Sequence, residues 1–430
     1  MRSGTEELFV GIDLGTSGCR AVAVDAAGRV RGTSAVALPA PLRDGAQVEQ
    51  DPTLWWEGVC GTLANLSAQV PLRNARALAI DGTSATLLLA DAAGTPLGPA
   101  LMYNDARATA EAERIARIAP RGSAAHGATS ALAKLLWLQR RHPGAHYALH
   151  QADWITGRLS GRFGISDENN CLKLGYDAVA RGWPEWLERL GVQSGLLPEV
   201  TVPGTDLGTI LPEFAVKFRI STSCRIVTGT TDSTAACLAA GVTAPGEAVT
   251  SLGSTLVVKV MSPVPVFAPE YGVYSHRLGD LWLAGGASNS GGAVLLRHFS
   301  RERLEALTPL LQPERATDLD YYPLAAPGER FPVNDPHWPP RLEPRPDDDA
   351  VFLQGMLEGM AQIERRAYRL LEELGAPYPR VVYSTGGGAR NEAWRRIRER
   401  LLGVPVIVAE HEDAAYGAAL LALRGVQPSS

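Results

Sequence analysis

The sequence predicts two related α/β domains. Its 430 residues are too many for one ordinary hydrophobic core, so we expect two domains of roughly 200 residues each. A glycine hairpin between apolar strands occurs twice, because "IDLGTS" at 12–17 aligns without a gap to "TSLGST" at 250–255. After the second hairpin, "LWLAGGASNSGGAVLLRHF" again supplies a strand, a small-residue turn and a helix, as a duplicated domain requires. We predict domains at 6–243 and 244–426.

The composition favours a small-molecule partner. With 45% hydrophobic and 20% charged residues the chain is typical of a globular protein, and its net charge of −5 argues against a long basic surface for nucleic acid or anionic lipid. The first residues lack the pattern of a secretion signal, and no apolar run approaches the roughly 20 residues that span a bilayer. We expect a cytoplasmic monomer or homodimer with no nucleic-acid or membrane partner.

Cysteine and histidine spacing does not favour a structural metal site. The five cysteines are odd in number and lack a C-x-x-C pair, so we interpret them as buried thiols. His142, His146 and His150 have helical spacing that would align three metal ligands. Pro143 and Gly144 break that helix, which favours surface histidines.

The elements of the first half follow from local signals. Apolar runs separated by glycine turns predict strands at 8–14, 19–25 and 29–37. Asp51 as an N-cap and Pro52 at the first helical position predict a helix over 52–70. The segment "RALAIDGTSATLLLADAAG" then repeats the opening order of strand, Asp, Gly-Thr-Ser and strand. Two further helices are expected at about 107–118 and 131–141.

A third glycine site lies near the C-terminus. The stretch "RVVYSTGGGARNEAWRRIRERL" predicts a strand over 380–384, the turn 386–388 and a helix capped near Asn391, a layout in which bare backbone can approach a phosphate or a nucleotide. The proline-rich and charged segment 327–349 predicts an ordered surface loop, to which we assign no chemistry.

The matched hairpins predict a polyphosphate site. Glycine lets backbone N–H groups approach phosphates closely, which suggests that the turns containing Thr16, Ser17 and Gly18, and Gly253 and Ser254, hold one polyphosphate between them. A carboxylate at Asp13 can bind the accompanying Mg²⁺ directly or through water. One such segment would more often be an ordinary hairpin. The second copy and the triple glycine favour the nucleotide site.

Asp232 has two possible roles. It follows an apolar strand in "RIVTGTTDSTAACLAAGV" and precedes a helix of small residues. Aspartate at that position is most often an N-cap, and the sequence alone favours this role. In phosphoryl transfer, an aspartate near the γ-phosphate accepts the proton of the substrate hydroxyl.

Taken in order, the motifs "GIDLGTSG", "EQDPTLWW", "ALMYNDAR", "LLWLQRRHP", "ADWITGRLSGRF", "GTTDSTAACLAAGV", "TSLGST" and "STGGGARNEAWRRI" resemble the FGGY carbohydrate kinase family from about residue 9 to 423. The resemblance implies two actin/hexokinase-like (ribonuclease H-like) ATPase domains, with the active site in the cleft between them. It also implies ATP, Mg²⁺ and transfer of the γ-phosphate to a sugar or polyol hydroxyl.

The same resemblance implies roles for individual residues. Asp13 would bind the metal, Thr16 and Ser254 the phosphates, and Asp232 would be the base that contacts the sugar hydroxyl. The adenosine motif of the family matches Gly386, Gly387, Gly388 and Asn391. Trp394, one helical turn further on, would either cover the adenine or be a core aromatic.

The sugar is expected near Gly82, Ser84, Asn104 and Asp105, although Asn104 and Asp105 are equally suited to a turn and cap before the next helix. Xylulose kinases usually have a Gln-Met-His-Gly type segment where this chain has Gly-Thr-Ser-Ala at 82–85. The short chain also resembles a compact subgroup of cyanobacteria and plants that is associated with D-ribulose. We therefore predict a D-ribulose kinase, with D-xylulose or another pentulose or polyol as the alternative.

Two further alternatives share the predicted fold. A nucleotide-switched binding protein of the actin or chaperone type would need neither a base at Asp232 nor the sugar segment "YNDAR". A degenerate kinase with residual ATPase activity would not need the intact glycine sites and Asp13. A ketopentose that strongly increases ADP release would argue against both.

Overall fold

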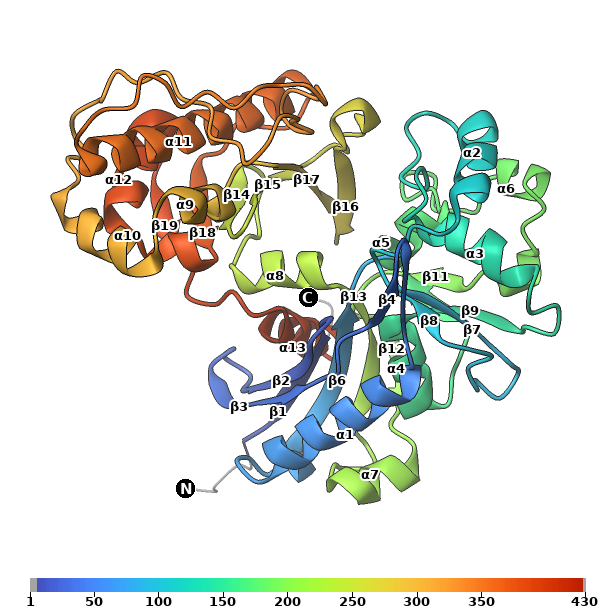
Figure 1. Ribbon diagram of the computed structural model, residues 1–430. Helices are drawn as coiled ribbons and strands as arrows, with labels where there is room; N and C mark the ends of the chain where they lie inside the picture. The colour runs from blue at the N-terminus through green and yellow to red at the C-terminus, as the bar shows by residue number, and fades with distance from the viewer. Residues whose placement is uncertain (1–5, 428–430) are drawn as a thin grey trace. The chain divides into compact units, whose positions relative to one another are not determined.

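The computed structural model describes residues 6–427, which form two compact units (Figure 1). The first unit contains the described residues up to 239 together with those from 413 onward, and the second contains 240–412. The boundary predicted between residues 243 and 244 lies a few residues from the division at 239/240. The last helix, α13 (Ala414–Gly425), packs with the first unit, whereas the sequence analysis assigned it to the second domain.

The central sheet of the first unit has the strand order β12-β13-β6-β1-β2-β3. β1 to β3 form an antiparallel meander, and β6 and β13 lie parallel to β1 on its other side. The three strands predicted at the start of the chain are confirmed to within a residue. The strands are β1 (Leu8–Leu14), β2 (Gly18–Val24), β3 (Val30–Ala37), β6 (Ala75–Gly82), β12 (Asp206–Thr209) and β13 (Arg225–Thr231).

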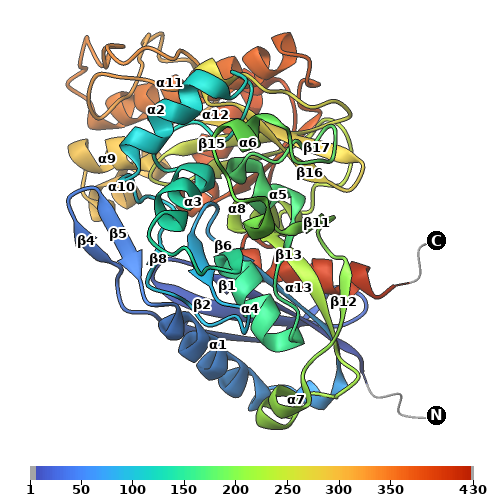
Figure 2. The same ribbon diagram turned by 90° about the vertical axis from the view of Figure 1, so that its right-hand side faces the viewer.

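Side chains of β1 alternate between two layers. Val10 and Ile12 join the hydrophobic core that also contains Trp55 and Val59 of α1 (Pro52–Ser67), because successive strand residues point to opposite faces. Gly11 points the other way, where a Cβ would lie 2.0 Å from a backbone oxygen of α13. Small residues thus let α13 pack directly on the sheet, while α1 covers the other face (Figures 1 and 2).

Local capping explains the start of α1. The Asp51 carboxylate accepts a hydrogen bond from Thr53 N at 2.8 Å, and Pro52 occupies the first turn, both as predicted. The helix ends at Ser67 rather than at residue 70. α4 (Gln151–Ser160) and α8 (Asp232–Ala239) also contact this sheet, and α7 (Pro212–Phe218) contacts α1.

A second sheet of the first unit has the order β4-β5-β8-β7-β9, and its core includes side chains from α2 and α3. The helices predicted at 107–118 and 131–141 are confirmed with shorter bounds. Elements of this region are β4 (Leu42–Asp44), β5 (Gln47–Gln50), β7 (Leu87–Ala90), β8 (Ala100–Leu101), α2 (Thr109–Ile118), α3 (Ala131–Gln139), β9 (Tyr147–His150), α4 (Gln151–Ser160), β10 (Ile165–Asp167), α5 (Glu168–Cys171), α6 (Trp186–Arg189) and β11 (Glu199–Thr201).

The second unit repeats the connectivity of the first. Its sheet order is β16-β17-β15-β14-β18-β19, with β14, β15 and β17 as the antiparallel meander and β18 and β19 parallel to β14. The predicted duplication is therefore visible in the topology. The elements are β14 (Glu247–Leu252), β15 (Leu256–Ser262), β16 (Tyr274–Leu278), β17 (Leu281–Ser288), α9 (Gly292–His298), α10 (Arg301–Leu307), α11 (Asp349–Glu373), β18 (Val381–Thr385), α12 (Glu392–Leu402) and β19 (Val406–Val408).

Two local interpretations need correction. His150 is fully buried and its Nδ1 contacts the Asp153 carboxylate at 2.9 Å, so it is not a surface histidine, although His146 is exposed. The loop 327–349 is not wholly superficial. Buried Glu329 accepts hydrogen bonds from Ser288 Oγ and Tyr322 Oη, and these bonds anchor the loop on the second unit.

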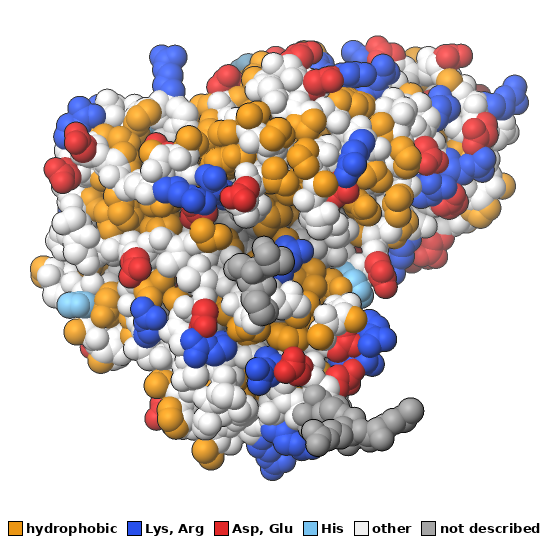
Figure 3. All heavy atoms as spheres, turned by 180° about the vertical axis from the view of Figure 1, so that it is seen from behind, with side chains coloured by type: hydrophobic (Ala, Val, Ile, Leu, Met, Phe, Trp, Pro, Cys, Tyr) orange, Lys and Arg blue, Asp and Glu red, His pale blue; other side chains and the backbone are white. Residues whose placement is uncertain are grey.

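The surface is mixed in charge. On the face shown in Figure 3, basic and acidic side chains are interspersed rather than separated into one basic region. Within residues 6–427, every helix is too short or too polar to cross a bilayer.

Thiol reactivity tests the packing of the first unit, which contains all five cysteines. Cys19, Cys171, Cys224 and Cys237 are buried and Cys60 is half-buried, and burial raises the pKa of Cys19 and Cys224 to about 12. Because the thiolate is the reactive form, we expect a maleimide to label Cys60 first and the other four thiols only after denaturation. Mass spectrometry of the labelled native protein measures this. Rapid labelling of Cys19 in the native state would contradict the packing of α1 on the sheet.

Candidate active site

Three aspartates of the first unit gather where parallel strands end. Asp13 of β1 is in register with Asp81 of β6, and Asp81 is in register with Thr230 of β13. Asp232 follows β13 directly as the first residue of α8. Carboxyl ends of parallel strands meet at one edge of a sheet, where α/β proteins bind ligands. The register therefore places the three carboxylates in one site.

The three carboxylates differ in exposure. Asp13 is 5% exposed and pairs with Arg20 at 3.2 Å. Asp81 is completely buried beside the Asp13 carboxylate, and its oxygens accept no hydrogen bond from an N–H group or hydroxyl of the described residues. Asp232 is half-buried and its Oδ1 accepts a hydrogen bond from Ser233 N at 2.6 Å. The site thus combines two buried acids, Asp13 and Asp81, with the half-buried Asp232.

Burial and mutual repulsion perturb the titration of this group. Burial raises the pKa of Asp13, and Arg20 partly opposes that rise. The pKa of Asp81 is raised well above its ordinary value, first by burial and then by the charges of Asp13, Asp232 and Asp413. Asp413 is the N-cap of α13 and accepts a hydrogen bond from Ala415 N. A cation at this site would relieve the repulsion.

The oxygens present fit Mg²⁺. Among the described residues no set of three or more His, Cys, Asp or Glu side chains is arranged to bind a metal alone. Mg²⁺ usually takes one or two carboxylates and completes its octahedron with water and substrate phosphates. Asp13 and the unbonded oxygens of Asp81 match that pattern. When bound, the ion would neutralise phosphate charge.

Asp81 was missed by the sequence analysis. Its signal is present, because Ile80-Asp81-Gly82 ends a strand just as Ile12-Asp13 does on the neighbouring strand. Only the register of β1 and β6 shows that the two acids adjoin. Sequence reasoning noted the repeated segment but considered it only as a place for the sugar.

The first glycine turn has the predicted hairpin geometry. Gly15 N donates to Gly18 O at 3.0 Å, and the turn leaves Ser17 exposed and Thr16 half-buried. Gly18 has a structural reason of its own, because a Cβ there would lie 3.2 Å from the Val36 carbonyl of β3. Thr16 and Ser17 thus lie in an accessible turn that directly follows the strand of Asp13.

The second unit brings its two glycine sites together. Ser251 of β14 is in register with Thr385 of β18, so the turn at 253–254 adjoins the turn at 386–388. Gly386 has φ +82°, and a Cβ there would lie 2.8 Å from Leu252 O. Gly386 N donates to the Glu412 carboxylate at 2.6 Å, and Gly253 O accepts from Gly292 N at 2.9 Å. Ser254 remains exposed beside this pair of turns.

The adjoining glycines and Trp394 have different environments. Nothing lies within 4 Å of a Cβ placed on Gly387, whereas one on Gly388 would lie 2.5 Å from the Trp394 ring. Trp394 is 3% exposed and belongs to the hydrophobic core of the second unit. Burial favours the core role over the predicted contact with adenine. Asn391 is the helix cap, as predicted, and its Oδ1 accepts from Trp394 N at 3.0 Å.

A matched pair of glycine variants separates packing from ligand binding. Gly388→Ala is expected to destabilise the protein by about 1–3 kcal/mol, because the new methyl group overlaps Trp394. Gly387→Ala should leave stability within about 0.5 kcal/mol, because its site is open. If the turn binds a nucleotide, Gly387→Ala should weaken ADP binding measured by calorimetry. Equal thermal stability of both variants would contradict the described packing.

Two buried polar atoms mark the predicted sugar region. Ser84 Oγ and Asn104 Oδ1 are buried and have no hydrogen-bond partner among the described residues. Gly82 lies against Gln151, whose Oε1 accepts from Thr83 N at 3.0 Å. Buried polar atoms are normally paired, so the two unpaired atoms are suited to the hydroxyls of a ligand.

Asp105 has a structural environment. It is fully buried, its Oδ2 accepts from Val48 N at 2.6 Å, and both of its oxygens accept from Arg107. Arg107 also bonds Glu49 at 2.9 Å. Because these donors occupy its oxygens, the geometry favours the turn role over the predicted contact with a sugar.

Comparisons with known proteins agree with this arrangement. The N-terminal domain of the FGGY family of carbohydrate kinases matches residues 8–239, and the C-terminal domain of that family matches residues 248–426. The chain belongs to the FGGY family of carbohydrate kinases. The fold is accordingly the two-domain α/β fold of these sugar kinases.

Relatives of this FGGY kinase are mainly xylulose kinases. The xylulose kinase of Streptomyces coelicolor is 30% identical, over 97% of this chain and 88% of the relative. That of Escherichia coli is 26% identical over 98% and 90% of the two chains. Among solved structures, a "xyloylose kinase" from Brucella ovis has a TM-score of 0.86 at 26% identity and covers 97% of this chain and 90% of its own.

Proposed function

We propose that this carbohydrate kinase transfers the γ-phosphate of ATP, bound with Mg²⁺, to a hydroxyl group of a ketopentose. The observation that carries the proposal is the convergence of Asp13, Asp81 and Asp232 at the carboxyl edge of the first sheet. Phosphoryl transfer needs a metal-binding carboxylate and a base close to the attacking hydroxyl. The proposed site provides both from adjacent strands.

Different residues of the site would accept the proton, hold the metal and bind the phosphates. Asp232 would orient the sugar hydroxyl and accept its proton, which needs correct placement rather than an unusual pKa. Asp13, with Asp81, would hold Mg²⁺. Phosphate oxygens would be bound by Thr16, Ser17, Gly18, Gly253 and Ser254, and the adenosine by the turn at 386–388.

The sugar is proposed to lie against Gly82, Ser84 and Asn104. The unpaired Ser84 Oγ and Asn104 Oδ1 support this place. Gly-Thr-Ser-Ala at 82–85 stands where xylulose kinases usually have a Gln-Met-His-Gly type segment and argues against D-xylulose, and the short chain resembles the subgroup that is associated with D-ribulose. The relatives, by contrast, are named xylulose kinases and favour D-xylulose. Both pentuloses are therefore candidates, and D-ribulose stays a prediction.

A substrate panel tests the proposal. ADP release by the purified protein is followed in a coupled assay with D-ribulose, D-xylulose, L-ribulose, glycerol and gluconate, each with and without Mg²⁺. We expect kcat/KM for one ketopentose to exceed the values for glycerol and gluconate by at least about 100-fold. ADP release that no sugar increases would overturn the proposal and favour a nucleotide-switched binding protein.

The predicted cytoplasmic location and the predicted monomer or homodimer also stay predictions.

A further inference from the structure

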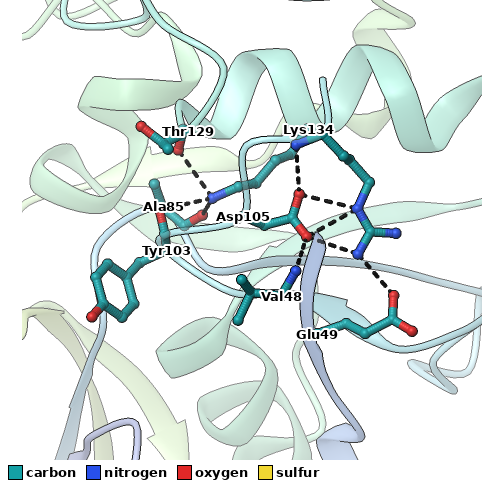
Figure 4. Close-up of polar contacts among 8 residues, drawn as sticks. Val48, Glu49, Ala85, Tyr103, Asp105, Thr129 and Lys134 are labelled. Atoms are coloured by element: carbon teal, nitrogen blue, oxygen red, sulfur yellow. Dashed lines mark hydrogen bonds and ion pairs between the residues drawn. The ribbon is translucent and has the colours of Figure 1, made fainter. Parts of the chain in front are cut away.

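Lys134 is a fully buried lysine in the middle of α3. Its Nζ donates hydrogen bonds to three backbone carbonyls, those of Ala85 at 2.7 Å, Thr129 at 3.0 Å and Tyr103 at 3.2 Å (Figure 4). An ammonium group has three donors and no acceptor, so these three carbonyls match its full capacity. Burial of a lysine costs desolvation free energy, and the hydrogen bonds to three separate segments offset that cost here.

Two of these carbonyls adjoin the unpaired polar side chains of the proposed sugar region. Ala85 follows Ser84 and has φ +67°, an unfavourable conformation for a residue with a Cβ. Tyr103 precedes Asn104. Lys134 therefore connects the segment after β6 to the segment after β8. Each connection is made at the residue next to a buried oxygen for which residues 6–427 provide no hydrogen-bond partner.

We propose that Lys134 is a positioning residue that holds Ser84 and Asn104 in the geometry that binds the sugar, and so determines sugar affinity. It contacts neither the reacting atoms nor the phosphate turns that are described above. The part of this inference that concerns sugar binding rests on the proposed function. The part that concerns the order of the turn at 83–86 does not. The hydrogen bond to Ala85 would compensate the strained backbone conformation at that residue.

Neighbouring contacts restrict both segments, the second through charged groups and the first through uncharged groups, which include the bonds of Thr83 to Gln151. Asp105, directly after Asn104, is tied to Val48 and Arg107, and Arg107 is tied to Glu49 (Figure 4). The turn at 83–86 has the hydrogen bond from Thr86 N to Thr83 O at 3.3 Å and the side-chain contact of Thr83 with Thr86 at 2.6 Å. Hydrogen bonds between charged groups are the stronger ones, so loss of the Lys134 ammonium should affect Ser84 more than Asn104.

The protonation state of Lys134 supplies a test that needs no substitution. Burial lowers the pKa of Lys134 to about 7, the negative charge of Asp105 opposes this and the positive charge of Lys173 adds to it. Arg107 and Glu49 face the same network through Asp105. The neutral amine has two donors and cannot serve three carbonyls. Sugar binding should therefore weaken as pH rises through about 7.

Kinetic measurements test the proposal with Lys134→Met, which keeps the length of the side chain and removes the donors. We expect the sugar KM to rise about tenfold or more, while kcat and the KM for ATP change less than about twofold. Lys217→Met is the matched control, because Lys217 is an exposed lysine of α7. In the wild type the sugar KM should increase from pH 6 to pH 8.5, and this increase should be absent in Lys134→Met. An unchanged sugar KM in the variant, or a wild-type sugar KM that is independent of pH, overturns the proposal.

Hydrogen exchange separates this inference from the proposed function. At fixed pH, amide exchange at Thr86 and Ala85 should be faster in Lys134→Met than in the wild type, with the amides of β1 unchanged. Equal exchange at these sites overturns the positioning role even if a sugar is phosphorylated. If the wild type phosphorylates no sugar, the proposed function fails, while the exchange measurement still decides whether Lys134 orders the turn. Should Lys134→Met not fold, the wild-type pH profile decides.

Discussion

Asp232→Asn is expected to lower kcat for sugar phosphorylation by about 10²–10⁴-fold while ATP affinity changes little. The amide has nearly the shape of the carboxylate and can still accept the hydrogen bond from Ser233 N, so α8 should begin as in the wild type. It cannot take a proton from the attacking hydroxyl. Coupled ADP release with the best ketopentose of the panel measures kcat, and calorimetry measures ATP binding.

Asp51→Asn is the matched control for this experiment. Asp51 also stands at the start of a helix, where its carboxylate accepts from Thr53 N, but it is exposed and far along the chain from the three gathered acids. Asparagine is as good an N-cap as aspartate, so both stability and activity should be retained. An Asp232→Asn enzyme with wild-type kcat would show that Asp232 serves only to begin α8.

Asp81→Asn is expected to stabilise the Mg²⁺-free protein by about 1–3 kcal/mol and to lower kinase activity by at least about 100-fold. The buried carboxylate of Asp81 accepts from no N–H group or hydroxyl within the described part of the chain and lies beside Asp13. An amide at this position can donate to Asp13 and removes the repulsion. It would also remove one of the two acids proposed to hold Mg²⁺.

The stability gain from Asp81→Asn should grow with pH. Burial and neighbouring acids raise the pKa of Asp81, so the folded protein keeps a proton that the unfolded chain releases. Wild-type stability is therefore lost as pH rises from the ordinary range of aspartate through the raised value. Asparagine does not titrate, and the variant should lack this loss. Thermal unfolding in EDTA at several pH values measures the difference.

A loss of stability in Asp81→Asn throughout that pH range would mean that the carboxylate has a hydrogen-bond donor in the folded protein.

The stability of the protein should also respond to the metal. Mg²⁺ with ADP is expected to raise the unfolding temperature of the wild type more than that of Asp81→Asn, because a ligand stabilises the state that binds it. An equal increase would remove Asp81 from the proposed metal site.

Local sequence signals determined much of this fold. Asp51 and Pro52 begin α1, Asn391 caps α12, and apolar alternation with glycine turns defines β1 to β3. Each of these depends on residues a few positions apart, whose preferences act before any long-range contact forms. The matched segments 12–17 and 250–255 also predicted the repeated topology of the two sheets, because equal local signals in equal order produce the same meander.

The sequence by itself therefore determined the elements with clear local signals, the duplication and the resemblance to the family, whereas the tertiary structure decided which polar residues meet. Parallel strand register brings Asp81 beside Asp13, and close packing of small residues joins α13 to the first unit. Trp394 is buried in the core and Asp105 forms an ion pair with Arg107, although the sequence analysis had considered both for ligand binding. The physical reason is that solvation and partners depend on segments distant along the chain. Their contacts are determined by packing, and no local motif encodes them.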